Sequence, residues 1–205
     1  MEPTFATRSR LLLLVVAITA ASAGCTVPMG ILRPGRATPV DTMSIPTVDA
    51  RALYRVRDLD WLRFDFDSDT DYARVIRRRE LNVYVRLRWC RDGLPGRELT
   101  TARLFGDGGR VSASSRLVPV SAPPPGSSVV FRYHTYVPVH LPRGPVMPAG
   151  SPDQGGDYDL RQPADDLCLT VGGGDMVGNH GESKPAVYSA EVVRGVFSHS
   201  QASGK

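Results

Sequence analysis

Four aspartates recur at every second position in one short stretch of the chain. They are Asp65, Asp67, Asp69 and Asp71. Carboxylate oxygens are the ligands that Ca²⁺ prefers, so a row of them at this spacing invites a calcium loop. An EF-hand loop that began at Asp67 would need Gly at position 72 and Glu at position 78, where the chain has Tyr72 and Arg78. We therefore predict an exposed strand face that runs into an acidic turn, and no metal site.

Two further groups of residues resemble ligand-binding patterns, but their spacing does not fit those patterns. His134 and His140 share one face of a predicted strand, where six residues at ~3.3 Å each place them about 20 Å apart, too far to share a metal. Residues 172–181 are rich in glycine but lack the Gly-Lys-Ser/Thr of a P-loop, and Val177 stands where a dinucleotide-binding motif has its third glycine. We expect a flexible connection there, or a loop that contacts a ligand or partner.

The sequence holds none of the short motifs that mark common catalytic sites. It has no G-x-S-x-G, S-x-x-K or H-E-x-x-H, although a Ser-His-Asp site assembled by the fold would leave no such trace. Tyr133, His134 and Tyr136, beside Arg132, suit a sugar-stacking patch, but aromatic residues in strands more often serve packing. We predict no enzyme and no cofactor.

The beginning of the chain has the pattern of an export signal. Arg8 and Arg10 form a short basic region, and residues 11–23 follow without a charge. Thirteen such residues suit the hydrophobic region of a secretory signal peptide. They are too few for a membrane-spanning helix, which needs ~20.

Residues 22–25 (Ser-Ala-Gly-Cys) end this leader, and here the stretch resembles the lipobox of bacterial lipoproteins. The last three residues match it, while Ser22 stands where an aliphatic residue is usual. The resemblance implies removal of residues 1–24 and attachment of palmitate and further acyl chains to Cys25. Several acyl chains give a durable membrane anchor.

The same leader leaves one alternative open. Residues 21–23 (Ala-Ser-Ala) also form an A-x-A site, and cleavage before Gly24 would release a secreted protein. In lipoproteins of Gram-negative bacteria, Asp after the lipidated cysteine favours the inner membrane. Because residue 26 is Thr26, the resemblance implies an outer-membrane lipoprotein that faces the periplasm.

Three cysteines, Cys25, Cys90 and Cys168, are an odd number for an exported protein. If Cys25 carries lipid, an oxidising compartment favours a Cys90–Cys168 disulfide, with two free thiols as the alternative. Both residues alternate with polar neighbours, so we expect the bridge on the outer face of a sheet or at strand ends. Its loop of about 79 residues would contribute roughly 4–5 kcal/mol.

Charge and proline content bear on partners and domain organisation. The chain has 25 basic and 21 acidic residues, a net charge of +4, without the basic block of a nucleic-acid-binding protein. Its length suits one domain. Prolines at positions 28, 34, 39 and 46 disfavour regular structure, so residues 25–50 are predicted to be the lipidated N-terminus and a flexible tether.

Period-two alternation predicts a β domain over residues 51–197. Leu62, Phe64 and Phe66 share one face of one strand, while residues 72–80 are ambiguous between helix and strand. Further strands are predicted at residues 52–57, 81–90, 98–105, 110–118, 129–141, 166–171 and 186–197.

The remaining segments are predicted to be connections. Residues 142–165 and 172–182 form long loops rich in glycine, and residues 198–205 form a polar tail. Pro138 suggests an edge strand or a bulge. About eight short strands favour an all-β fold, an antiparallel β-sandwich or a small barrel.

These expectations suit a cell-envelope lipoprotein with a binding or structural role. Its partner would be another envelope protein or a glycan, met through the two long loops. The alternatives are a periplasmic protein that binds a small ligand such as a glycan or calcium, and a secreted enzyme without a recognisable motif.

Overall fold

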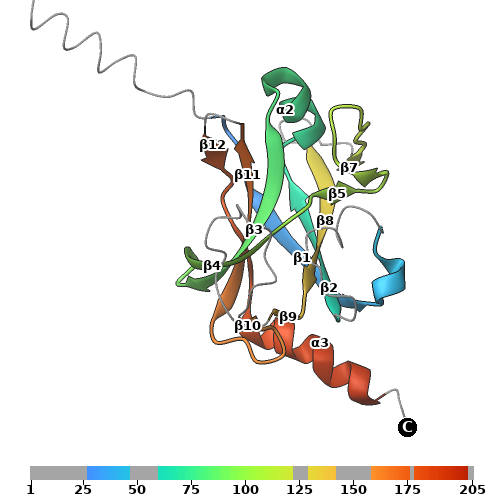
Figure 1. The fold of residues 1–205 in the computed structure, drawn as a ribbon, viewed down its shortest axis with the longest axis vertical. Helices are drawn as coiled ribbons and strands as arrows, with labels where there is room; N and C mark the ends of the chain where they lie inside the picture. The colour runs from blue at the N-terminus through green and yellow to red at the C-terminus, as the bar shows by residue number, and fades with distance from the viewer. Residues whose placement is uncertain (1–26, 47–59, 122–128, 142–157, 176–177, 203–205) are drawn as a thin grey trace, which may run out of the picture.

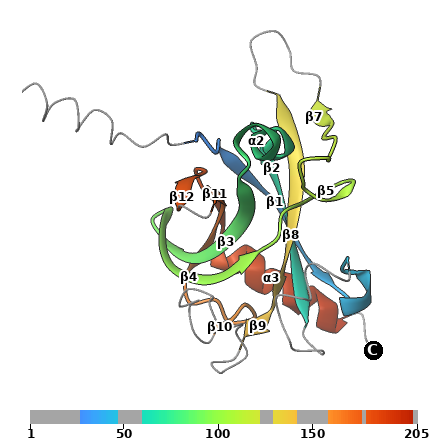
Figure 2. The ribbon, with the colours of Figure 1, turned by 45° about the horizontal axis from the view of Figure 1, so that its top comes forward.

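The computed structural model describes residues 27–46, 60–121, 129–141, 158–175 and 178–202. Two antiparallel sheets pack against each other as separate layers (Figures 1 and 2). Neither sheet closes on itself within these residues, so the predicted β-sandwich is confirmed over the small barrel. Two short helices, α2 and α3, lie at opposite ends of the sandwich (Figure 1).

The first sheet has the strand order β1-β2-β8-β5-β6, with β7 also paired to β8. Its strands are β1 (Leu32–Val40), β2 (Trp61–Ser68), β5 (Phe105–Gly106), β6 (Gly109–Arg110), β7 (Pro119–Ser121) and β8 (Val130–Pro138). The second sheet has the order β12-β11-β3-β4, with β13 also paired to β11. Its strands are β3 (Asn82–Arg91), β4 (Leu94–Ala102), β11 (Asp166–Gly174), β12 (Asn179–Glu182) and β13 (Ala186–Tyr188).

The remaining elements cover the ends of the sandwich. They are the 3₁₀ turn η1 (Thr42–Ser44), α2 (Tyr72–Arg79), the small pair β9 (His140–Leu141) and β10 (Tyr158–Asp159), and α3 (Ala190–Ala202). The ambiguous segment that follows β2 is thus a helix. Asp71 caps it by accepting the backbone N–H of Arg74 at 2.9 Å, and Glu80 ends it in the left-handed region at φ 55°.

The core lies between the two sheets, as the alternation predicted. Leu62, Phe64 and Phe66 of β2 are at most 1% exposed, and they face the apolar side chains of β3 and β11. Tyr188 joins the layers, because its hydroxyl donates to the Asp65 carbonyl at 2.6 Å and its ring meets Phe64 edge-on. Burial of these side chains contributes most of the driving force for folding.

The predicted tether is wrong over most of its described length. Residues 32–40 form β1, which pairs with β2 along its whole length. Pro34 and Pro39 are compatible with this strand because β1 is the edge of the sheet, where a missing N–H breaks no ladder. Met29 and Ile45, on either side, are each 1% exposed. The domain therefore begins near residue 27, not residue 51.

The predicted last strand is mostly a helix. β13 covers residues 186–188, and α3 then extends into the segment expected to be a polar tail. Val193, Val196 and Phe197 recur at helical spacing and pack against the core. Ser189 caps α3, since its hydroxyl accepts the N–H of Val192 at 3.2 Å. The richness in valine had suggested a strand, but the spacing identifies a helix.

Two other boundaries differ from the prediction. The chain turns at Asp92 and Gly93, both with positive φ, so β4 begins at Leu94, before the predicted strand over residues 98–105. Of the expected strand over residues 110–118, only Arg110, the last residue of β6, is in a strand, and β7 begins just after this range. Residues 105–110 form a short hairpin, the β5–β6 pair. The predicted strand at residues 52–57 lies outside the described residues.

Candidate functional site

The segment that follows Cys25 is bound to the second sheet from its first described residue. The N–H of Val27 donates to the carbonyl of His180 in β12 at 2.9 Å. Gly30 accepts from the Lys184 N–H at 2.9 Å, and Leu32 donates to the Lys184 carbonyl at 3.2 Å. These backbone hydrogen bonds fix the start of the domain against β12 and the residues that follow it.

The same segment is bound to α2 from its other side. The Tyr72 hydroxyl donates to the Met29 carbonyl at 2.7 Å, and Asp69 Oδ1 accepts the Ile31 N–H at 3.0 Å. The Tyr133 hydroxyl accepts the Tyr72 N–H at 3.0 Å and donates to the Thr70 carbonyl at 2.8 Å. Burial raises the pKa of both tyrosines, so they stay neutral hydrogen-bond donors. This cluster joins the N-terminal segment, α2 and β8.

Only one residue, Thr26, separates Cys25 from Val27. Two residue steps span at most about 7 Å, whatever their conformation. A group attached to Cys25 therefore lies close to the end of the sandwich that carries α2 and β12 (Figure 1). Cys25 itself lies outside the described residues.

This end of the sandwich is basic. Arg74, Arg77, Arg78 and Arg79 of α2 are all exposed, and none of them forms an ion pair with another described residue. Arg77 donates to the carbonyls of Ala113 and Ser115 at 2.8 and 3.0 Å, which holds the loop between β6 and β7 against the helix. Because both acceptors are neutral carbonyls, they do not neutralise the positive charge of the Arg77 guanidinium.

Exposed apolar side chains lie at the same end. The structure describes five large hydrophobic residues that are exposed, and three of them lie here: Ile31 precedes β1, Val118 precedes β7 and Val120 lies within β7. Val118 is 80% exposed. We call this surface the α2 end. It consists of Ile31, Arg74, Arg77, Arg78, Arg79, Arg116, Val118 and Val120.

A second feature is a charged groove on the outer face of the first sheet. Its volume is about 480 Å³, and its lining comes from β1, β2 and β8. The lining residues are Gly35, Arg36, Arg63, Asp65, Phe66, Asp67 and Arg132. A bulge in β1 brings the backbone at Gly35 so close that a Cβ there would lie 2.5 Å from the Asp65 carbonyl oxygen. Glycine is needed at that position.

The four aspartates do not form a cluster. Asp65 pairs with Arg63 at 2.6 Å, and Asp67 lies 3.7 Å from Arg132. Asp69 binds the N-terminal segment and Asp71 caps α2. Each carboxylate thus has a separate structural partner. In the part of the chain that the structure describes, no three His, Cys, Asp or Glu side chains come together in a way that could hold a metal ion.

The aromatic side chains of β8 serve packing, as favoured above, and do not form a surface for stacking sugars. Tyr133 is fully buried in the core, while His134 and Tyr136, on the other face of β8, are each only 7% exposed. The His134 ring stacks on Phe105 at a centroid distance of 5.7 Å. Burial, and then the charge of Arg63, lower the pKa of His134 to about 4, so the ring is neutral near pH 7.

The other histidines lie apart. His140 Nδ1 is 3.1 Å from the Tyr158 carbonyl, and Asp175 Oδ2 is 2.7 Å from His180 Nε2. The side chain of His199 lies outside the described residues. No described histidine therefore shares a site with another histidine.

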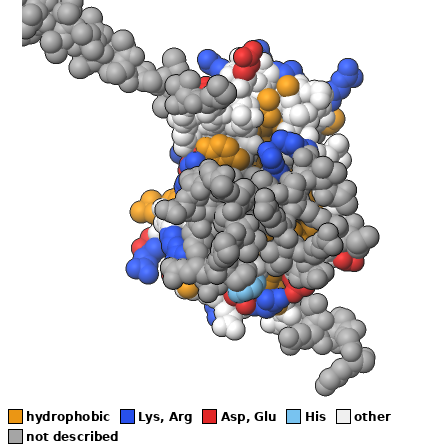
Figure 3. Space-filling model, in the orientation of Figure 1, with side chains coloured by type: hydrophobic (Ala, Val, Ile, Leu, Met, Phe, Trp, Pro, Cys, Tyr) orange, Lys and Arg blue, Asp and Glu red, His pale blue; other side chains and the backbone are white. Residues whose placement is uncertain are grey.

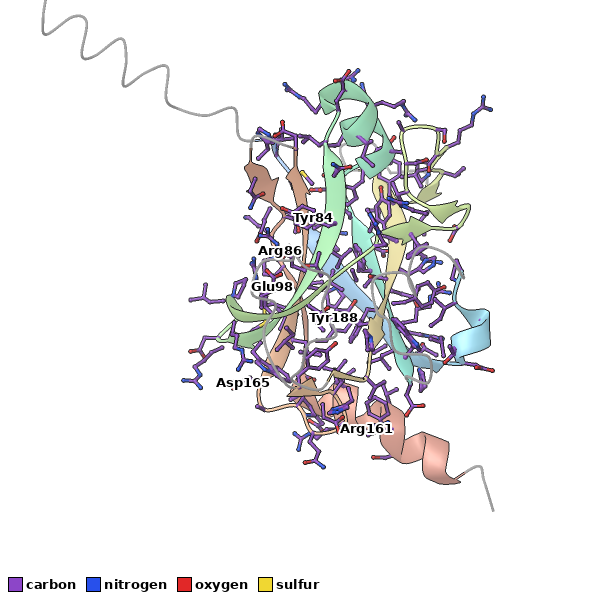
Figure 4. The ribbon with its side chains drawn as sticks, viewed as in Figure 1. Tyr84, Arg86, Glu98, Arg161, Asp165 and Tyr188 are labelled. Atoms are coloured by element: carbon purple, nitrogen blue, oxygen red, sulfur yellow. A yellow bond between two sulfur atoms is a disulfide. The ribbon has the colours of Figure 1, made fainter. Side chains whose placement is uncertain are left out.

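The outer face of the second sheet carries a cluster of charges that the sequence analysis missed. Glu182 of β12 accepts hydrogen bonds from Arg86 and Arg88 of β3, with Arg88 Nη1 at 2.7 Å from Oε2. Glu98 of β4 lies 3.4 Å from Arg86, whose guanidinium also covers the Tyr84 ring (Figure 4). Burial alone would raise the pKa of Glu182, but the hydrogen bonds and charges of the arginines lower it. The carboxylates and guanidinium groups of this cluster therefore pair with one another.

The Cys90–Cys168 disulfide lies on this same outer face. The two residues are diagonal neighbours on β3 and β11, with Cα atoms 5.4 Å apart. They are 3% and 0% exposed, although they point away from the apolar core. The predicted pairing and the predicted outer-face position are both present in the structure.

The glycine-rich segment is a hairpin rather than a flexible connection. Gly172, Gly173 and Gly174 belong to β11, which pairs with β12. A Cβ on Gly172 would lie 2.7 Å from the Tyr84 ring, so glycine lets that ring lie over the strand. Residues 142–157 of the other predicted binding loop lie outside the described residues.

Within the described ranges, no helix has both the length and the apolar character needed to cross a bilayer. Comparisons of this chain with protein-family models, with curated proteins and with solved structures found no match.

Proposed function

We propose that this chain is a bacterial lipoprotein of the cell envelope, anchored through acylated Cys25, with the sandwich as a binding or structural module. The leader and its lipobox-like end support the anchor. The disulfide supports an oxidising compartment, since such bridges persist there. Thr26 favours the outer membrane, on its periplasmic side. The observation that carries the proposal is a leader with the pattern of an export signal, which ends at a cysteine two residues before Val27, the first described residue of the fold.

The test is maturation in the presence of globomycin, which inhibits signal peptidase II. We expect uncut precursor to accumulate, and mass spectrometry of untreated cells to find an N-terminal peptide with acylated Cys25. A Cys25→Ala variant is the matched control, because it keeps the hydrophobic leader. Normal maturation with globomycin, or an N-terminus at Gly24, would contradict the anchor and favour the secreted form.

The module's partner is proposed to be another envelope protein or a glycan. Of the two loops first favoured for that contact, residues 172–182 are now seen to pair within the second sheet, so their deletion would disturb the fold. Exposed side chains are better probes of a partner surface than loop deletions. No part of this proposal involves catalysis or nucleic acid.

The groove on the first sheet favours a second candidate function, the binding of a small ligand. Arg36, Arg63 and Arg132 surround it, opposed by only two carboxylates, which suits an acidic sugar or another small anion better than Ca²⁺. A thermal-shift screen with uronic acids, neutral sugars and Ca²⁺ tests this. A ligand at about 100 times its Kd adds about 2.7 kcal/mol to the free energy of unfolding and raises Tm.

In that screen, an Arg36→Gln variant should lose the shift, while Arg97→Gln, on the other sheet, should keep it. Arg36 is exposed and lines the groove, so the change removes a charge without removing core contacts. If no acidic sugar shifts the Tm of the unaltered protein, the groove has no such ligand.

A further inference from the structure

The α2 end combines five exposed arginines with three exposed aliphatic side chains. Figure 3 shows Lys and Arg side chains gathered around the upper end of the molecule, with apolar side chains among them. Arg74 and Arg78, four residues apart on α2, share the helix face opposite the buried Tyr72 and Ala73. Guanidinium groups beside exposed aliphatic residues form a surface that suits the boundary between lipid headgroups and acyl chains.

This end has fewer acidic than basic residues, and most of the acidic residues form local hydrogen bonds or ion pairs. Asp69 accepts the Ile31 N–H, Asp71 caps α2, and Asp175 faces His180. Glu80 is the exposed acidic residue that follows the helix. The outward face of α2 therefore keeps a positive field, which is attractive for anionic phospholipids.

The position of the N-terminal segment determines which environment the α2 end faces. Val27 is hydrogen-bonded to β12, and Cys25 lies within about 7 Å of it along the chain. If Cys25 carries acyl chains, as the proposed function holds, their entry point into the bilayer is beside the α2 end. A tether of twenty or more residues would have let the domain turn freely, but the fold leaves only Thr26 for that purpose.

We propose that the α2 end is a membrane-docking surface that binds anionic phospholipid headgroups and holds the sandwich against the bilayer. The arginines would contact phosphate groups, and Ile31 and Val118 would enter the headgroup layer. α3 would then point away from the membrane, toward envelope partners, and the β3–β4 turn would project from the side of the molecule (Figure 1). This inference goes beyond the anchor proposed above and uses a different part of the molecule.

The test uses residues 25–205 with Cys25→Ser, which keeps every described element and carries no lipid. Binding to vesicles of phosphatidylcholine, with or without about one quarter phosphatidylglycerol, is measured by sedimentation at about 0.05 M and about 0.5 M salt. We expect binding only to the anionic vesicles and only at low salt. An Arg78→Gln/Arg79→Gln variant should lower the partition coefficient roughly 5-fold per arginine, about 25-fold in all.

The matched control is Arg91→Gln/Arg194→Gln, which removes two exposed arginines from the opposite end. Arg91 ends β3 about 30 Å from Asn82, the residue nearest α2 on that strand. This variant should bind like the unaltered protein. Equal weakening by both pairs would show nonspecific attraction of a basic protein and overturn the proposal, provided that circular dichroism shows all variants folded.

A second readout tests insertion directly. A fluorophore sensitive to polarity, coupled to Val118→Cys, should brighten on anionic vesicles, while the same probe at Leu94→Cys, 72% exposed at the other end, should not. Absence of binding to anionic vesicles would also overturn the proposal. It would do so even if the α2 arginines proved necessary for binding an envelope protein. Because this protein carries no acyl chain, these outcomes are independent of the globomycin test.

Discussion

At the scale of single residues, buried polar side chains fix the beginning of the domain. The Tyr72 hydroxyl satisfies the Met29 carbonyl, and the Tyr133 hydroxyl satisfies both the Tyr72 N–H and the Thr70 carbonyl. A buried carbonyl that loses its donor costs about 1–3 kcal/mol. The Tyr72 hydroxyl is therefore one of the groups that hold the N-terminal segment in place.

We predict that Tyr72→Phe lowers the free energy of unfolding by about 1–3 kcal/mol, because the Met29 carbonyl loses its partner while the ring stays in place. Hydrogen exchange at Gly30 and Ile31 should speed up more than exchange in β3. Tyr84→Phe is the control, since that hydroxyl lies at the exposed sheet face. Unchanged stability in urea would contradict the assigned role of the hydroxyl.

His134 gives a second prediction at this scale. Its folded pKa of about 4 lies below its unfolded value of 6.5, so its neutral form stabilises the fold fully above pH 6.5. That contribution is lost as the pH falls from 6.5 toward 4 and reaches up to about 3 kcal/mol. Urea unfolding of the unaltered protein should weaken over this range relative to His134→Phe. Parallel pH profiles for the two proteins would show that the ring does not titrate as described.

At the scale of elements, β12 is attached to its sheet both by backbone pairing with β11 and by side-chain ion pairs. It pairs with β11 over a short, irregular register, and Glu182 adds ion pairs to two arginines of β3. Val27 is hydrogen-bonded to β12 in turn. The stability of the chain's beginning is therefore linked to one carboxylate on the outer face of the second sheet.

We predict that Glu182→Gln lowers the free energy of unfolding by about 1–3 kcal/mol, because Arg86 and Arg88 lose the charged partner to which they donate. Amides of β12 should exchange faster, followed by that of Val27. Glu191→Gln, which changes an exposed residue of α3, should leave urea unfolding within about 0.5 kcal/mol of the unaltered protein. A similar effect of both changes would argue that the cluster is unimportant.

At the scale of the whole molecule, one disulfide closes a loop that includes strands of both sheets. Cys90 lies near the end of β3 and Cys168 lies near the start of β11, 78 residues later, so β4 to β10 lie between them. Such a bridge acts mainly on the unfolded chain, whose freedom it restricts. The orientation of the molecule also belongs to this scale, because α2 and the start of β1 lie at one end and α3 lies at the other (Figure 1).

We predict that Cys90→Ala/Cys168→Ala loses about 4–5 kcal/mol of stability relative to the oxidised protein. Non-reducing mass spectrometry of the unaltered protein should find the two cysteine peptides joined. Cys25→Ala should leave the stability of the domain unchanged, since that residue precedes the fold. Equal unfolding midpoints for the oxidised protein and the double variant would contradict a stabilising role for the bridge.

Much of the fold was predictable because the inner strands obey a local rule. Leu62, Phe64 and Phe66 alternate with charged residues, and such alternation places one face inward regardless of which strands are neighbours. The pairing of Cys90 with Cys168 was predicted on the premise that Cys25 carries lipid in an oxidising compartment, and the disulfide is present in the structure. The helical spacing of Val193, Val196 and Phe197 was also present in the sequence, but the β-branched residues concealed it.

The sequence by itself indicated the all-β architecture and the outer-face position of Cys90 and Cys168, since these depend on composition and on period two. Only the tertiary structure decided that a proline-containing segment becomes β1, because an edge position tolerates proline and no local pattern reports it. It also decided that the carbonyl of Met29 meets the hydroxyl of Tyr72, 43 residues away. Contacts between distant residues depend on how the layers pack, and that packing brings the start of the domain beside the arginines of α2.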